Sequence, residues 1–263
     1  MTFLDYGKAT PLYSLWKRVR SWSESRERVK TFREWSTRDQ VRLEFYRQFV
    51  QPGELVFDVG ANLGNRAKVF AKLGATVVAV EPQAVCGDFL ETMFTGDRRF
   101  HLVRKGLGAA PGTAEMLVSS EHAISSFSPE WVHSVQVSGR FAQQRWDERQ
   151  TVEIDTLDRL IAKFGRPAFV KIDVEGFEHE VVAGLSTAVR GLSLEFASEY
   201  LSGSVRCIDH LTRLGDSQFQ ISLGESMTFL LKEWVGAADV KRELQRLPSA
   251  AFGDVYVRML GDI

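Results

Sequence analysis

The chain has 263 residues, of which 44% are hydrophobic and 25% charged, and its net charge at pH 7 is −1. This length suffices for one substantial hydrophobic core, and the composition is that of an ordinary globular protein. The balanced charge lacks the basic excess typical of nucleic-acid-binding proteins, so we expect no nucleic-acid partner. The two cysteines have no metal-ligand spacing, and no run approaches the ~20 apolar residues of a membrane span or the apolar segment of a signal peptide. We therefore expect a cytoplasmic protein without a transmembrane segment.

The first 50 residues are predicted to form a helical arm in front of a domain that spans 51–263. Apolar residues recur there at helical spacing, and residues 17–47 contain ten Lys or Arg against five Asp or Glu. Such a basic amphipathic arm is suited to peripheral contact with an anionic membrane or to gripping an acidic substrate. The simpler alternative is that the arm packs on the domain, or on a second subunit in a homo-oligomer. Ser36 and Asp39 indicate a break between two helices.

The stretch VFDVGANLGN, residues 56–65, is predicted to be a strand that turns sharply into a helix. The apolar run before the turn is typical of a strand buried in a parallel sheet. Gly60 and Gly64 lack side chains at the turn, so backbone N–H groups can approach a ligand closely. A helix over 65–73 and a second strand over 76–80 complete the βαβ unit that we expect.

The acid that follows the second strand, Glu81, lies 21 residues after Gly60, near the ~20-residue offset at which such units bind the hydroxyls of a ribose. The dinucleotide fingerprint G-x-G-x-x-G is broken, because Asn62 replaces its second glycine. This pattern favours a nucleoside without a pyrophosphate, and S-adenosylmethionine is the common one. The cofactor-binding residues that we predict are Asp58, Gly60, Asn62, Gly64 and Glu81.

The chain then departs from simple α/β alternation. We expect a helix over 84–94, a strand over 101–103, a turn and strand within 105–119, a short strand over 152–154 and a helix over 157–164. Residues 119–150 are polar with large aromatic residues and few periodic signals, which favours an inserted active-site loop. His122 and Trp131 in this loop are candidate substrate-binding residues. The alternatives are a solvated histidine and a tryptophan that only holds the loop down.

A buried strand is expected at 168–172, followed by Asp173 and Glu175 and by a helix over 178–185. Because the carboxyl ends of parallel strands line the ligand crevice of an open α/β sheet, both acids should face the same cleft as the glycine turn. Lys171 lies inside the apolar run, where an unpaired charge is costly, so we expect a salt bridge to an acid of the cleft.

The last strands are expected near the end of the chain. Glu195 lies near the end of a strand over 192–196, and it is a further candidate substrate-binding residue. Two apolar runs, 228–231 and 254–258, are predicted to form a terminal antiparallel pair.

Three segments resemble, in this order, the signature segments of the FkbM family of S-adenosylmethionine-dependent methyltransferases: VFDVGANLGN…VVAVEP, VEIDTLDRL and FVKIDVEGFEHEVVAGL. The resemblance spans about residues 54–196. It implies a class I methyltransferase fold, Rossmann-like, with a mostly parallel seven-stranded sheet and an antiparallel last strand. It also implies methylation of a hydroxyl, on a sugar or a polyketide-like product. Asp58, Gly60, Asn62 and Gly64 match the cofactor turn, Glu81 the ribose-binding acid, and Asp173, Glu175 and Gly176 the later segment. The chain departs from the family in having Asn65-Arg66 after the turn, where aromatic or hydroxyl residues are usual.

Methyl transfer is an in-line displacement, so the protein must hold donor and acceptor aligned. A hydroxyl is a poor nucleophile until it loses its proton, and Asp173, Glu175 and His179 are the candidate general bases. The alternative is a divalent cation such as Mg²⁺, with Asp173 and Glu175 among its ligands. Asp173 is also well placed to accept hydrogen bonds from the next helix, and His179 to lie on the surface.

No two prolines are adjacent and neither cysteine follows a proline, so motifs of amino and cytosine-C5 methyltransferases are missing and oxygen is the favoured acceptor atom. We expect an O-methyltransferase that acts on a sugar, a glycan or glycolipid precursor, or a secondary metabolite. The alternatives are an NAD-dependent dehydrogenase on the same sheet and a non-catalytic nucleoside-binding scaffold whose basic arm recruits a partner or membrane.

Overall fold

The computed structural model describes residues 29–119 and 121–261, so the first part of the predicted arm lies outside the described residues. Its helices are α2 (Thr37–Tyr46), α3 (Asn65–Lys72), α4 (Ala84–Met93), α5 (Pro129–Val137), α6 (Leu157–Phe164), α7 (Glu178–Ala183), α8 (Leu201–Leu214) and α9 (Ala237–Arg246), with short 3-10 turns η2 (His122–Ile124) and η3 (Ser198–Tyr200). Its strands are β1 (Leu55–Val59), β2 (Thr76–Val80), β3 (Phe100–Val103), β4 (Gly106–Leu107), β5 (Gly112–Val118), β6 (Glu148–Asp155), β7 (Phe169–Ile172), β8 (Gly191–Ala197), β9 (Ser217–Leu223) and β10 (Phe252–Met259).

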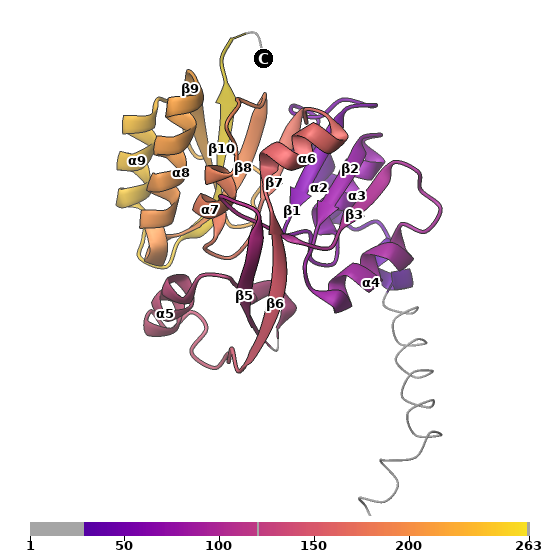
Figure 1. Cartoon of the computed structure of the whole chain (residues 1–263). Helices are drawn as coiled ribbons and strands as arrows, with labels where there is room; N and C mark the ends of the chain where they lie inside the picture. Colours follow the sequence, from indigo (N-terminus) through magenta and orange to yellow (C-terminus); the bar gives the residue numbers. More distant parts are fainter. Residues whose placement is uncertain (1–28, 120, 262–263) are drawn as a thin grey trace, which may run out of the picture.

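Seven strands form one sheet in the order β3-β2-β1-β7-β8-β10-β9 (Figure 1). β10 runs antiparallel to both of its neighbours, and the other pairs are parallel. The predicted α/β fold, a mostly parallel seven-stranded sheet with an antiparallel last strand, is confirmed. The chain order reverses between β1 and β7, and an open α/β sheet binds its ligand at such a switch point.

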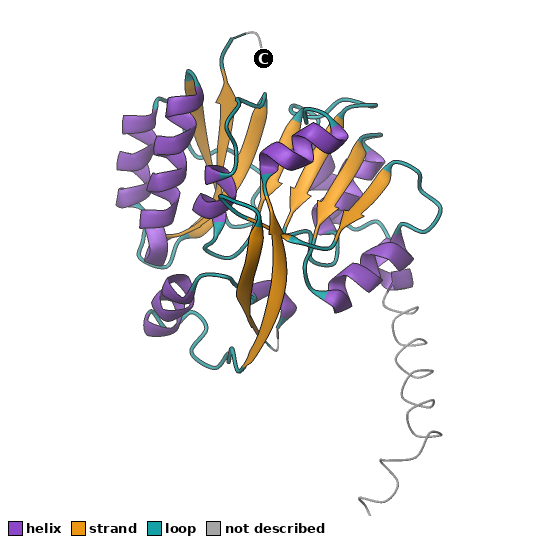
Figure 2. Cartoon of the chain, in the orientation of Figure 1, coloured by secondary structure: helices purple, strands orange, loops and turns teal. Residues whose placement is uncertain are grey.

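Helices cover both faces of this sheet and make a three-layer molecule (Figure 2). One face carries the larger core, in which α6, α7, α8 and α9 pack on apolar side chains of β1, β7, β8 and β10. The other face is covered by α2, α3 and α4. Among the described residues, no helix combines the length and the apolar character needed to cross a bilayer.

The second helix of the predicted arm is part of this packing. Ser36 caps α2 in a capping box with Asp39, which confirms the predicted break between two helices. Tyr46 at the end of α2 is fully buried and packs edge to face on Phe70 of α3. Residues 37–46 therefore belong to the domain's core, whereas the predicted membrane contact and homo-oligomer stay predictions.

The segment expected to be an inserted loop, residues 119–150, is only partly a loop. It contains η2 and α5 and ends in the first residues of β6, which is longer than the predicted strand at 152–154. β6 pairs with β4 and β5 in a second, three-stranded sheet, and the antiparallel pair β5–β6, whose strands are connected through η2 and α5, projects beyond the main sheet (Figure 1). Trp131, Val132 and Val135 of α5 form a small core of their own with Leu117 and Tyr200. The large aromatic residues of this segment interrupt the helical spacing of apolar residues in the sequence, and they pack in this small core.

The predicted strand at 228–231 is wrong, and β10 pairs instead with β9 and β8. The side chain of Gln220 binds the backbone of this segment: its Nε2 donates to the carbonyls of Leu231 and Glu233, and its Oε1 accepts from the N–H of Leu231. Phe229 packs on Phe45 and Tyr256. Phe229 thus packs on the core from a loop, whereas Leu230 is 46% exposed.

A buried ion pair crosses the middle of the sheet, as expected for Lys171. Its Nζ lies 2.7 Å from Oδ1 of Asp254 on β10 and 3.2 Å from Oδ2 of Asp173. Lys171 is 1% exposed and Asp254 4%, so each charge depends on the other for compensation. The hydroxyl of Tyr256 lies 3.4 Å from the second oxygen of Asp254, and that of Tyr46 lies 3.3 Å from Tyr256.

Replacing Lys171 with Met should lower the free energy of unfolding by about 3–5 kcal/mol, because it leaves the Asp254 carboxylate buried without a partner. The double variant Lys171→Met/Asp254→Leu should be more stable than Lys171→Met alone, since it removes both buried charges. Urea unfolding measures both. The free energy of unfolding that the double variant loses is compared with the losses in Lys171→Met and in Asp254→Leu. If it equals their sum, the two side chains do not compensate each other.

Candidate active site

The turn after β1 is held against the end of β7 by a close backbone contact. Gly60 has a φ of +79°, and a Cβ atom at this position would lie 1.8 Å from the carbonyl oxygen of Asp173. Only glycine fits, for both conformational and steric reasons. This contact brings the cofactor turn and the Asp173 segment to one edge of the sheet, as the sequence predicts.

Asp58 lies beneath the turn. It is 2% exposed, and its carboxylate accepts a hydrogen bond from the backbone of Ala67 in the first turn of α3. Gly64, the residue at the N-cap of that helix, offers no side chain for capping, so Asp58 satisfies a free N–H of α3 from the neighbouring strand. Burial raises the pKa of Asp58 to about 7, against the lowering effect of Lys171 and Arg66. Asp58 therefore supports the turn through its contact with the start of α3.

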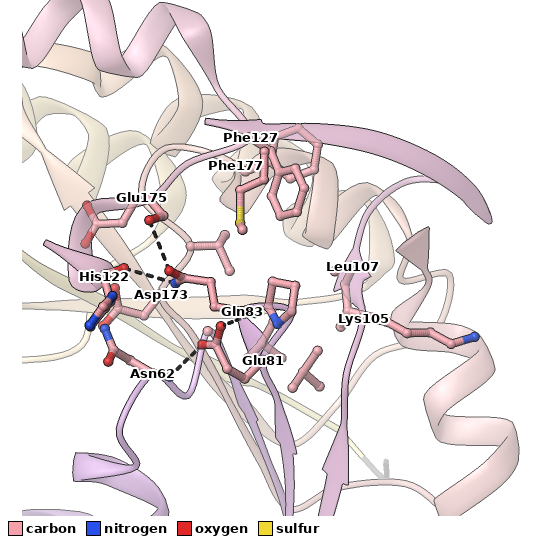
Figure 3. Close-up of a pocket in the computed structure, with 18 of the residues that line it drawn as sticks. Asn62, Glu81, Gln83, Lys105, Leu107, His122, Phe127, Asp173, Glu175 and Phe177 are labelled. Atoms are coloured by element: carbon pink, nitrogen blue, oxygen red, sulfur yellow. Dashed lines mark hydrogen bonds between the residues drawn. The ribbon is translucent and has the colours of Figure 1, made fainter. Parts of the chain in front are cut away.

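Glu81, at the end of β2, is fixed by two backbone hydrogen bonds. One oxygen accepts from the N–H of Asn62 and the other from the N–H of Gln83, both at 2.8 Å (Figure 3). Burial raises the pKa of Glu81, and these two bonds oppose the rise. Each carboxylate oxygen retains an acceptor position for a further donor. Glu81 is therefore oriented to accept hydrogen bonds from a diol such as ribose.

Glu81, Asn62 and Gly60 line a cavity that also reaches Asp173 and Glu175. Its opposite wall is largely apolar and comes from the segment between β3 and α5, through Leu107, Met116 and Phe127 (Figure 3). A polar acid at one side and apolar side chains at the other suit a nucleoside. Of the five predicted cofactor residues, Gly60, Asn62 and Glu81 line this cavity, whereas Asp58 and Gly64 support it from outside.

The insertion, residues 119–150, covers this cavity and forms hydrogen bonds with residues on both of its sides. Gln83 donates from Nε2 to the carbonyl of His122 at 3.0 Å and accepts from Ser125 Oγ at 3.2 Å. On the other side, Ser126 Oγ donates to the carbonyl of Glu175 at 2.6 Å. Gln83 and Ser126 were not predicted from the sequence as site residues. The signal that could have indicated them is their closeness in the chain to Glu81 and to His122, respectively.

The predicted substrate residues of the insertion fall in different places. His122 lines the cofactor cavity and a neighbouring polar cavity that also contains Gln83. Trp131 is 4% exposed, and its indole lies so close to Gly176 that a Cβ there would be 2.3 Å away. Trp131 thus packs the insertion onto the Asp173 segment, and no open ring face remains for stacking on a sugar.

Three carboxylates meet at the end of the cavity. Asp173, Glu175 and Glu195 each offer an oxygen, and these atoms lie within 4.8 Å of one another. Glu195 reaches the group from β8, and Glu175 from a left-handed backbone conformation with φ +54°. Backbone strain of this kind is concentrated at functional sites.

The three carboxyl groups differ in the direction of their pKa shifts. Burial raises the pKa of Glu175 well above its ordinary value, and Asp173 and Glu178 add to the rise. Burial, Asp173 and Glu175 do the same for Glu195. Burial opposes ionisation of Asp173 too, but the Lys171 ammonium and a hydrogen bond from Glu195 lower the pKa of Asp173. Asp173, whose side chain is 35% exposed and lies 3.2 Å from the Lys171 ammonium, is therefore the acid of the three that is best placed to act as a carboxylate.

Glu178 shapes the loop that carries two of these acids. It is buried, and its Oε1 accepts from the N–H groups of Val174 and Gly176 at 3.0 and 3.2 Å. Burial raises the pKa of Glu178 to about 7. The sequence analysis identified Glu178 only as a helix start. Its position just after the turn V-E-G was the signal for a side chain that folds back on it.

His179 lies away from the three carboxylates. Its Nε2 is 3.3 Å from Glu180, and burial and the charge of Arg206 lower its pKa. It does not line the cofactor cavity. The structure thus brings together Asp173, Glu175 and Glu195, and leaves His179 outside the group.

A sheet of this strand order, with the antiparallel strand β10 between β8 and β9 and a cavity lined by Gly60 and Glu81 at its switch point, defines a class I S-adenosylmethionine-dependent methyltransferase. Residues 58–198 match the methyltransferase FkbM domain, which is more than half of the chain. The chain belongs to this family. Family membership decides against the alternative of an NAD-dependent dehydrogenase.

Solved structures with detectable similarity are methyltransferases of low sequence identity. They include a precorrin-6Y C5,15-methyltransferase from Geobacter metallireducens, with 12% identity, a TM-score of 0.45, and coverage of 84% of this chain and 86% of that chain. A magnesium protoporphyrin IX methyltransferase from Synechocystis, with bound S-adenosylmethionine, has 12% identity, a TM-score of 0.43 and coverage of 85% and 78%. A TehB-like methyltransferase from Corynebacterium glutamicum has 10% identity, a TM-score of 0.43 and coverage of 84% and 88%. Among curated proteins, none matches this sequence.

Replacing Glu81 with Gln should weaken the binding of S-adenosylhomocysteine by about tenfold or more, because a neutral amide is a poorer acceptor for the ribose hydroxyls than a carboxylate. Isothermal titration calorimetry measures this directly. Asp88→Asn, on the exposed face of α4, is the matched control and should bind as the wild type does. Equal affinity in the Glu81 and Asp88 variants would contradict the ribose-binding role.

The raised pKa of Glu178 makes stability depend on pH. Its pKa in the folded state is about 7 and in the unfolded state about 4.5, so its contribution is fully present below pH 4.5 and is lost as the pH rises through 7. The loss amounts to about 3 kcal/mol. Glu178→Gln keeps an acceptor for the two N–H groups and should remove this part of the pH dependence. Urea unfolding at pH 5 and pH 8 tests it, and parallel pH profiles for the variant and wild type would contradict it.

Proposed function

We propose that the protein is an O-methyltransferase that transfers a methyl group from S-adenosylmethionine to a hydroxyl of a sugar, a glycan or glycolipid precursor, or a secondary metabolite. The observation that carries this proposal is the group of three carboxyl side chains, Asp173, Glu175 and Glu195, in which Asp173 lines the cavity and lies 3.2 Å from the Lys171 ammonium. A hydroxyl acceptor needs a base of this kind, because it must lose its proton as the new bond forms.

The Lys171 ammonium and a hydrogen bond from Glu195 lower the pKa of Asp173, although other acids lie beside it. In the reaction, the Asp173 carboxylate takes the proton of the acceptor hydroxyl while the hydroxyl oxygen bonds to the methyl carbon. The bound cofactor supplies an electrophilic methyl group on a sulfonium, whose carbon–sulfur electron pair returns to sulfur. Glu81 holds the ribose, so the chain fixes donor and base relative to one another.

Two further acids beside Asp173, both with raised pKa values, suit an acceptor with several hydroxyl groups. In the protonated form, Glu175 and Glu195 can each donate one hydrogen bond and accept others. Beside a carboxylate base, such groups orient a polyol and select which hydroxyl approaches Asp173. This chemistry supports a sugar-like acceptor.

A divalent cation such as Mg²⁺ is the second candidate for activating the hydroxyl. Asp173, Glu175 and Glu195 offer three carboxylate oxygens within 4.8 Å, a donor set that a hard cation accepts. Lys171 already places a positive charge 3.2 Å from Asp173, which weakens the case for a second cation at the same acid. The base mechanism is therefore the one that we propose.

The test is release of S-adenosylhomocysteine from S-adenosylmethionine with a panel of sugar and glycan acceptors. Asp173→Asn should lower kcat by about 10²- to 10⁴-fold, while the affinity for S-adenosylhomocysteine changes by less than about threefold, since Glu81 and the glycine turn are intact. Chelation with EDTA should leave the wild-type rate unchanged.

Three outcomes would contradict the proposal that the protein is an O-methyltransferase with Asp173 as its base. Full activity of Asp173→Asn would exclude it as the base. A rate lost on chelation and restored by Mg²⁺ would favour the cation. Tight cofactor binding without product from any hydroxyl acceptor would favour the non-catalytic scaffold.

A further inference from the structure

A polar cavity adjoins the cofactor cavity, between the start of α4 and the segment that leads into β6. The two cavities have Gln83 and His122 in common, so a ligand that lies beside His122 can reach into both. In Figure 3, His122 lies on the side of the cofactor cavity that carries Glu175, apart from the apolar wall at Leu107. The polar cavity is therefore reached from the side on which the carboxyl groups lie.

The charges in the wall of the polar cavity balance and are not used within the chain. Its lining includes two arginines and two acids, Arg145, Arg149, Asp147 and Glu148. In the part of the chain that the structure describes, none of these four side chains forms an ion pair or a hydrogen bond. Opposite charges that line one cavity without pairing leave both donors and acceptors available to a ligand.

The strand β6 directs Glu148 to this cavity. Side chains alternate along a strand, so Glu148 and Gln150 project from the same face of β6 as the buried Val152. The direction of that face is given by Gln150, whose Nε2 donates to the carbonyl of Pro82 at 3.2 Å. Pro82 precedes α4, so Glu148 faces the start of this helix across the polar cavity.

The same cavity has an apolar surface on its other side. Val85, in the first turn of α4, lines the cavity and is 60% exposed. A sugar carries hydroxyl groups around its ring and C–H groups on its ring faces, so it needs both kinds of surface. A neutral ligand also fits the balanced charge, whereas an anion would meet the two acids and a cation the two arginines.

We propose that the polar cavity is an acceptor subsite, which binds the second sugar of a neutral oligosaccharide while the first sugar presents its hydroxyl to Asp173. Glu148 accepts hydrogen bonds from hydroxyls of the second sugar, Arg145 donates to them, and Val85 packs against the ring. The inference rests on the proposed function. It narrows the acceptor to a neutral glycan that is longer than a single sugar.

The test measures the release of S-adenosylhomocysteine with neutral monosaccharides, as methyl glycosides, and with neutral oligosaccharides of the same sugars. The wild type should have a kcat/KM at least about tenfold higher for the oligosaccharides, and Arg145→Ala/Glu148→Ala should remove this advantage, because hydrogen bonds to two charged groups are lost. The loss should be in KM, since the cofactor turn and Asp173 are unchanged. The rate with monosaccharides should stay within about threefold of the wild type, which also shows that the variant is folded.

Glu115→Ala/Arg166→Ala is the matched control, because it also removes one exposed charge of each sign and neither residue lines the two cavities. It should keep the preference for oligosaccharides. Equal use of monosaccharides and oligosaccharides by the wild type, an unchanged preference in the Arg145/Glu148 variant, or the same loss in the control would overturn the subsite. A tenfold preference for phosphorylated or carboxylated oligosaccharides over neutral ones of equal length would overturn its assignment to a neutral glycan.

A binding measurement separates failure of the subsite from failure of the proposed function. Isothermal titration of the same oligosaccharides into protein saturated with S-adenosylhomocysteine detects the subsite without turnover. Binding that Arg145→Ala/Glu148→Ala weakens, without product from any hydroxyl acceptor, would support the subsite and overturn the proposed function. Product from monosaccharides without oligosaccharide binding would overturn the subsite alone.

Discussion

The site depends on one steric constraint, the contact between Gly60 and the carbonyl of Asp173. β1 and β7 are neighbours in the sheet, and their register places Val59 opposite Ile172. Each strand therefore delivers its exit turn to the same point, and the two turns can share that point only if one of them lacks a side chain. The glycine turn, Glu81 and Asp173 come to one edge of the sheet, and the backbones of the two turns touch there.

The electrostatics of the active site follow from this crowding. Glu175 and Glu195 lie beside Asp173, and burial and neighbouring negative charge raise the pKa of both. Lys171 lowers the pKa of Asp173, because its ammonium lies between Asp173 and Asp254. Tyr256 and Tyr46 continue this line of polar contacts to α2. The helix before the sheet is thus connected through buried groups to the acid proposed as base.

The insertion contacts both sides of the site, the turn after β2 and the turn after β7. It meets the cofactor side through Gln83 and the acceptor side through Ser126 and Trp131. Because the same segment contacts both turns, a change in its position alters both at once. Acceptor selection and cofactor enclosure are therefore expected to be coupled in this enzyme.

The sequence by itself determined the parts of the fold that depend on local pattern. The βαβ unit, the buried strand before Asp173 and the acid at Glu81 follow from apolar runs, glycines and spacing, and so did the need of Lys171 for an acidic partner. Only the tertiary structure decided which distant residues meet. It placed Glu195 beside Asp173, Asp254 on Lys171 and Glu225 on Arg66, and it left His179 outside. It also made a loop of residues 228–231, because the Gln220 side chain binds the backbone of this segment and only part of the run packs on the core. The physical reason is the same throughout: periodicity reports which face of an element is buried, whereas side-chain partners far apart in the chain are fixed by strand order and packing.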